Sequence, residues 1–286
     1  MKQFWHCLDN YDNSFLEKDY SLSKGGPAMN TPSKQHTGAG PAHQLTPPAD
    51  AAQNNWIVIG TTCSVLLSVA LAVSFLMPFL TAAALAPFFY QAIKRGDVRA
   101  AFNYALRWGV ILFLCVSVLA IYLPDRTAGS IPLAERCIGT MGAWVNGVEA
   151  PVPFGPVTIL VGLAGIALAS IFSGGLGAII IGAGTLGCAA CTFTFLVRHG
   201  ENILQMAVIG NPPWIIAFCA AGLFLLVPTA LPFYRRLLGT MLPEERDEAY
   251  AKTHALIGAS LVLVSIAFAI LLDNTWQQVL SDYTVW

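Results

Sequence analysis

The chain has 286 residues, of which 56% are hydrophobic and 11% are charged. Soluble domains carry about 25% charged residues, so this composition excludes an ordinary soluble enzyme. The formal net charge of −1 provides no basic surface for nucleic acid, and we expect the lipid bilayer as the main partner. The sequence predicts an all-α fold, a polytopic membrane bundle of about six transmembrane helices with a glycine-rich central hairpin.

The N-terminal segment, residues 1–55, is polar and rich in Pro, Gly, Asn, Gln, Ser and Thr. Its apolar content is too low to form a core, so we interpret it as a disordered tail. Lys24, Gly25 and Gly26 precede Met29 closely, as a translated ribosome-binding site would, which makes Met29 a candidate for the true start. The alternative is an ordinary flexible tail. We expect no cleaved signal peptide, because no basic stretch leads directly into an apolar one.

The first apolar run covers residues 56–92 and contains Pro78 and Pro87. Proline interrupts the hydrogen-bond ladder of a helix unless its neighbours compensate. We therefore expect one span, residues 56–77, followed by a kinked or interfacial piece. The alternatives are a short re-entrant hairpin and a second crossing.

The middle of the chain predicts three further spans. Residues 104–123 form the second span, and residues 125–155 form a loop of mixed polarity, part of which is apolar enough to lie flat on the membrane. The stretch 157–198 has no charge before Arg198. It is long enough for two crossings of about 20 residues each, with a turn at Gly174 and Gly175.

Small residues recur at four-residue spacing in the second half of this hairpin. They fall on two lines, one with Gly174, Ala178 and Gly182, the other with Ala183, Gly187 and Cys191. Helices in lipid associate by close backbone packing, which small residues permit. We therefore expect helix-packing roles for Gly174, Ala178, Gly182 and Gly187.

The last part of the chain predicts an interfacial helix at residues 203–209, a fifth span at 214–233 and a sixth at 254–272. The membrane domain then covers residues 56–273, and residues 274–286 form a short C-terminal tail.

Cationic side chains at span ends act as interfacial anchors. We expect this role for Arg198 and His199 after the fourth span and for Arg235 and Arg236 after the fifth.

Lys and Arg in short loops predict the orientation. Six spans place the cations at 94–99 and 235–252 on one side, which we expect to be cytoplasmic, with both termini outside. The lysines of the tail oppose this arrangement, and a start at Met29 removes most of the conflict. If residues 56–92 cross twice, the N-terminus moves inside.

Cys188 and Cys191 are the most specific local chemical feature, because i, i+3 spacing places both thiols on one helix face. Membrane thiol oxidoreductases need thiolates of lowered pKa and a quinone or thiol partner. Arg198 and His199 lie about two turns away, too far to supply a nearby charge or a shared metal site. We therefore favour small packing residues and expect no catalytic residue and no metal.

No ionisable residue falls at the centre of an expected span, which argues against an ion-coupled carrier. No P-loop, hydrolase elbow, zinc-protease or dinucleotide motif occurs, so we expect no cofactor. The sequence favours a non-catalytic subunit or permease-like component in the cell membrane, with a protein partner or a second copy of itself. The alternatives are a thiol-redox enzyme using Cys188 and Cys191, and a small-molecule transporter.

Overall fold

The computed structural model describes residues 49–148, 151–238 and 245–284. Met29 and most of the expected tail lie outside the described residues. Pro48–Trp286 forms one compact unit. The described part is built from helices, with one isolated bridge between Gly200 and Thr284. The prediction of an all-α fold is confirmed.

Seven helices are long and apolar enough to cross a membrane, one more than the sequence predicted. They are α2 (Ala49–Leu71), α3 (Leu76–Lys94), α4 (Val98–Tyr122), α7 (Pro156–Ser173), α8 (Leu176–His199), α10 (Pro213–Leu238) and α11 (Glu245–Leu271). Their length and hydropathy define a multi-pass membrane bundle.

The extra helix comes from residues 56–92, where one span and an interfacial piece were expected. The chain breaks before Pro78, between Ala72 and Phe75, both of which adopt left-handed backbone conformations. Pro78 lies in the first turn of α3, where its missing N–H leaves no helical bond unmade. Pro78 therefore helps to start a helix, and Pro87 is accommodated inside it.

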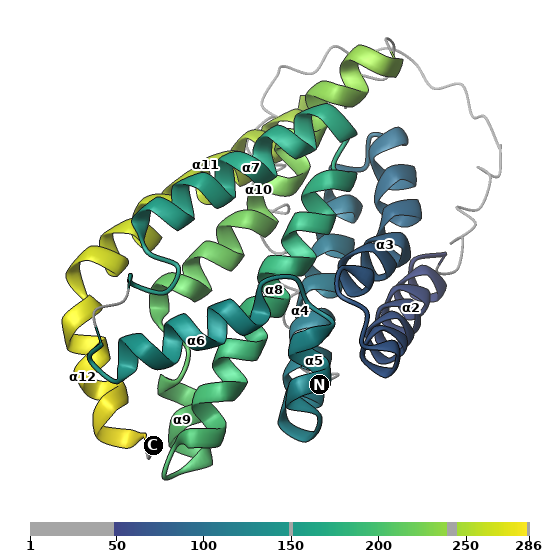
Figure 1. Cartoon of the computed structure of the whole chain (residues 1–286). Helices are drawn as coiled ribbons and strands as arrows, with labels where there is room; N and C mark the ends of the chain where they lie inside the picture. The colour runs from purple at the N-terminus through teal and green to yellow at the C-terminus, as the bar shows by residue number, and fades with distance from the viewer. Residues whose placement is uncertain (1–48, 149–150, 239–244, 285–286) are drawn as a thin grey trace, which may run out of the picture. The chain divides into compact units, whose positions relative to one another are not determined.

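Four shorter helices lie at one end of the bundle, which we call the short-helix end (Figure 1). They are α5 (Pro124–Gly129), α6 (Ala134–Val145), α9 (Ile203–Ile209) and α12 (Asp273–Tyr283). A helix is therefore present at residues 203–209, as expected, and its interfacial position stays a prediction. Residues 125–155, expected as a loop, contain most of α5 and all of α6, and the expected C-terminal tail contains α12.

Tertiary contacts explain why α12 is helical. The Trp276 Nε1 donates to the Ile209 carbonyl at 3.2 Å, and Leu280 is fully buried. The Trp144 Nε1 on α6 donates to the Asp273 carboxylate at 2.8 Å. Such partners lie far away in the chain, so local sequence does not reveal them.

Helix α8 is the most buried of the seven long helices. Within its most apolar window 61% of residues are buried, against 22% for α7 and for α11. It contacts α3, α4, α6 and α7, and α6 lies across its lower half in Figure 1. The expected hairpin thus has one central arm, α8, and one peripheral arm, α7.

The turn between these arms requires glycine. Gly174 and Gly175 both have positive φ, at 62° and 94°, a conformation that glycine adopts without steric cost. A Cβ at Gly174 would lie 2.6 Å from the Phe233 ring, and the Tyr234 hydroxyl donates to the Gly174 carbonyl at 2.8 Å. The expected turn is therefore at Gly174-Gly175.

Candidate functional site

The residues expected to pack helices differ in their surroundings. A Cβ at Gly187 would lie 2.8 Å from Met77 Cε and 3.2 Å from Ile131. A Cβ at Gly182 would meet no atom within 4 Å, apart from its own helix backbone. Ala178 is buried. The Cβ position of Gly187 is therefore occupied by neighbouring side chains, whereas that of Gly182 is open. The helix-packing role of these residues stays a prediction.

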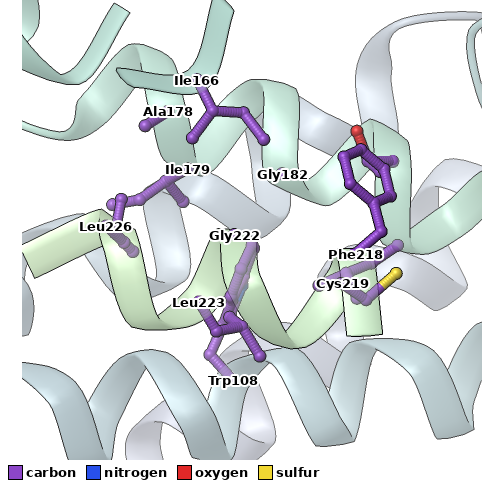
Figure 2. A pocket seen from close by; sticks show the side chains of 12 residues that line it. Trp108, Ile166, Ala178, Ile179, Gly182, Phe218, Cys219, Gly222, Leu223 and Leu226 are labelled. Carbon is purple, nitrogen blue, oxygen red and sulfur yellow. The ribbon is translucent and has the colours of Figure 1, made fainter. Parts of the chain in front are cut away.

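Gly182 instead borders a small apolar cavity of about 30 Å³ between α4, α7, α8 and α10 (Figure 2). We call it the Gly182 cavity. It is lined by Trp108, Ile166, Ala178, Ile179, Gly182, Thr185, Leu186, Phe218, Cys219, Gly222, Leu223 and Leu226. Apolar cavities of this kind stay dry, and ligand sites measure about 300–1,000 Å³. We interpret it as space left by small side chains.

A larger cavity of about 440 Å³ opens at the short-helix end, between α4, α5, α6 and α8. We call it the Cys191 cavity. Its lining consists of Ala120, Pro124, Asp125, Ala128, Glu135, Ile138, Gly139, Cys191, Thr194, Phe195 and Arg198. This volume lies within the range of about 300–1,000 Å³ that is typical of small-molecule sites.

The rim of the Cys191 cavity carries charges of both signs. Asp125, Glu135 and Arg198 are exposed there. Among the described residues, no ion pair joins Arg198 to either carboxylate. Of these three, only Arg198 was singled out from the sequence. The carboxylates come from α5 and α6, which the sequence did not predict as helices.

The floor of this cavity is formed by α8 and offers few polar groups. The Thr194 hydroxyl donates to the Ala190 carbonyl at 2.8 Å and to the Ser117 carbonyl at 3.4 Å. The Cys191 thiol, buried at 2% exposure, is the other polar side chain on the floor. The floor therefore suits the apolar part of a ligand, and the rim suits its charges.

Cys188 faces a different neighbour from the one expected. Its thiol donates to the Pro132 carbonyl at 3.4 Å, just before α6. A hydrogen-bonding interaction with Cys188 and the charge of Arg136 lower the pKa of the Cys137 thiol on α6, although burial opposes them. Spacing along α8 could not reveal this pair, because the two cysteines belong to separate helices.

The expected interfacial anchors lie at helix ends. His199 Nδ1 lies 2.8 Å from the Phe195 carbonyl, and its ring packs on Phe195 with centroids 4.4 Å apart. Arg235 and Arg236 lie near the end of α10, and the Arg236 side chain is exposed. Among the described residues, no three metal-ligating side chains converge.

Fold and site together define a multi-pass helical membrane protein with an open, charge-rimmed cavity at its short-helix end. No family model matches the chain, and neither does any curated protein or solved structure.

Proposed function

We propose that this multi-pass membrane protein is a non-catalytic component of a membrane complex, and that it binds a small zwitterionic ligand in the Cys191 cavity. The observation that carries the proposal is the rim, where the charges of Asp125, Glu135 and Arg198 surround an opening of ligand size without pairing to one another. A zwitterion presents an ammonium group to the carboxylates and a carboxylate to the guanidinium, in charge-assisted hydrogen bonds.

The two cavities lie on opposite sides of α8. This arrangement favours a protein that binds its ligand over one that transports it. At about 100° per residue, Gly182 and Cys191 point to opposite sides of α8. Between them along the helix lie Ala189 and Ala190, both fully buried. The wall that separates the two hollows is therefore a packed helix, and the described residues offer no continuous path between them.

We also propose that the cavity faces the exoplasmic side. Seven crossings place the 95–97 turn opposite the short-helix end. Only Arg126, Arg136 and Arg198, of 15 Lys and Arg residues, belong to segments at the short-helix end. The positive-inside rule then makes the opposite end cytoplasmic. This is the orientation expected for the case in which residues 56–92 cross the membrane twice.

A binding experiment on the purified chain in detergent tests the function. Thermal melting is recorded with a panel of zwitterionic amino acids, each compared with the matched carboxylic acid and the matched amine. At least one zwitterion should raise the midpoint well above both of its analogues, because each analogue lacks one of the two ionic contacts. Equal shifts for all three members of every set, or no shift with any, would contradict the proposal.

Membership of a complex needs a separate measurement. Chemical crosslinking in native membranes, followed by purification and mass determination, should give a species heavier than one chain. A single-chain mass under conditions that crosslink a known membrane complex would rule out both a protein partner and a second copy.

A further inference from the structure

The Cys191 cavity changes in polarity and in exposure from its rim to its floor, and this change restricts the ligand. We propose that its ligand is an α-amino acid with a long apolar side chain, such as leucine or norleucine. The charged groups of the ligand lie at the rim, and its side chain extends toward Cys191. This inference rests on the function proposed above, because it names the class of ligand for the same cavity.

One face of α8 runs from the rim to the floor. Its lining residues are Cys191, Thr194, Phe195 and Arg198, which have the i, i+3, i+4, i+7 spacing of a single helix face. Arg198 is exposed and Phe195 is partly buried. Thr194 and Cys191, one and two turns further in, are only 1% and 2% exposed. At a rise of about 1.5 Å per residue, Arg198 lies about 10 Å from Cys191 along the helix axis.

The neighbouring segment of α4 and α5 shows the same order. Ala120 is buried, Pro124 is partly buried and Asp125 is exposed. Helix α4 contacts α8, and both run toward the short-helix end (Figure 1). Two separate helices therefore agree on which end of the cavity is open and which is closed. The open end carries the charges, and the closed end is buried.

Below the rim, the cavity offers few groups that could replace water around a ligand. The lining residues there are Ala120, Pro124, Ala128, Ile138, Gly139, Cys191, Thr194 and Phe195. Only Thr194 and Cys191 among them have polar side chains. The Thr194 hydroxyl already donates to two carbonyls, and a thiol is a weak donor and a weak acceptor. An apolar side chain is therefore favoured here, whereas a polar side chain would lose hydrogen bonds to water.

The rim alone would also suit a basic amino acid. Asp125 and Glu135 outnumber Arg198 among the lining residues, so a second ammonium group on the ligand would balance the charge. All three side chains are exposed, however, and water and salt screen exposed charges. The second carboxylate therefore needs no partner from the ligand, and the apolar wall below the rim decides the side chain.

A homologous series of amino acids tests this inference by isothermal titration of the full chain in lipid nanodiscs. Alanine, 2-aminobutyrate, norvaline and norleucine share one zwitterionic head and differ only in the length of an apolar side chain. Affinity should rise roughly fourfold with each added methylene group. Equal affinity for all of them would overturn this inference and leave the zwitterion proposal intact. Binding of none would overturn both.

Polar analogues test the apolar wall directly. Asparagine has nearly the shape of leucine, and lysine adds an ammonium group to the end of the norleucine side chain. Each should bind at least about tenfold more weakly than its apolar counterpart, because its polar group finds no adequate partner below the rim. Equal affinity of asparagine and leucine would overturn the inference. So would tighter binding of lysine than of norleucine, because the rim would then select a second ammonium group.

A variant of the floor locates the end of the ligand side chain. Ala120→Val narrows the closed end of the cavity, so the ratio of norleucine affinity to alanine affinity should fall severalfold. This ratio does not depend on how much of the variant is folded. Ile121→Phe is the matched control, because Ile121 is the next residue on α4, is 44% exposed and lies outside the lining. It should keep the wild-type ratio. A wild-type ratio in Ala120→Val, or an equal fall in both variants, would overturn the proposed placement of the side chain.

Discussion

The two cavities that border α8 differ in volume, in lining and in the other helices around them, although both also touch α4. The Gly182 cavity has about 30 Å³ and an apolar lining, and the Cys191 cavity has about 440 Å³ and a charged rim. The former lies among long helices, where neighbouring spans supply only apolar atoms. The latter is closed by α5 and α6, which belong to the connection between two spans. In this bundle, the two carboxylates of the rim come from the connection between two spans, whereas the span α8 supplies the floor and Arg198.

The comparison also separates two uses of glycine along one helix. At Gly187 an added Cβ would meet the side chains of Met77 and Ile131, whereas at Gly182 it would enter open space. Spacing in the sequence treats the two alike, because both belong to lines of small residues. Only the position of the neighbouring helix distinguishes contact from empty space.

The largest expected effect is that of Gly187→Leu, which lies on α8 between the levels of the two cavities. The added side chain must displace Ile131 and the end of Met77, and overpacking of this kind costs about 1–3 kcal/mol. We expect a clearly lower melting midpoint in detergent and a broader elution profile. Leu114→Ala, at an exposed position on α4, is the control and should change little. A wild-type midpoint for Gly187→Leu would mean that α3 and α8 are not in close contact.

Ligand binding should depend on the rim of the Cys191 cavity. Arg198→Gln removes the one cation among the residues that line this cavity, leaving Asp125 and Glu135. Hydrogen bonds to charged groups contribute about 1.5–3 kcal/mol, so we expect the affinity for the best zwitterion to fall at least about tenfold. Isothermal titration measures it. Arg126→Gln, also exposed at this end but outside the lining, should bind as the wild type does, and an equal loss in both variants would exclude a specific role for Arg198.

The reactivity of Cys137 should depend on Cys188. When Cys137 loses its proton, the Cys188 S–H can turn from the Pro132 carbonyl to the Cys137 thiolate, and this hydrogen bond holds the pKa of Cys137 low. Cys188→Ala removes that donor, so the pKa of Cys137 rises and its alkylation by iodoacetamide should reach half its maximal rate at a higher pH. Cys219→Ala serves as the control. An unchanged pH profile in Cys188→Ala would show that the two thiols do not interact.

The smallest expected effect is that of Gly182→Ala. The added methyl group enters the Gly182 cavity, where it meets no atom within 4 Å apart from its own helix, and glycine in a helix interior is less stable than alanine by roughly 0.5–1 kcal/mol. We expect a slightly higher melting midpoint. Gly187→Ala, tested in parallel, should lower it. A lower midpoint for Gly182→Ala would mean that another helix occupies this space.

The sequence predicted those parts of the molecule that depend on local composition. The long apolar runs gave α4, α7, α8 and α10, and the Gly174-Gly175 turn followed from its residue types. Residues 56–92 predict one span if Pro78 ends a helix, but proline is equally suited to the first turn of a helix. The local pattern of a proline does not distinguish these two roles.

The residues of the candidate site were harder to predict from local sequence than the long helices. Arg198, Cys188 and Cys191 were singled out, but the neighbouring residues Glu135 and Cys137 lie on α6. That helix is short, and isolated helices of such length are marginal in water. Contacts across the fold hold it in place, and a single sequence carries no direct record of them.

The link between Trp144 and α12 has a consequence for how the protein is made. The indole of Trp144 donates to Asp273, which lies 129 residues later in the chain, and Gln277 donates to the Trp144 carbonyl. A ribosome that has delivered α6 to the membrane must therefore add four more long helices before this partner emerges. We expect the short-helix end to be the last part of the protein to mature during synthesis, and nascent chains halted before Asp273 to leave Trp144 open to solvent quenchers.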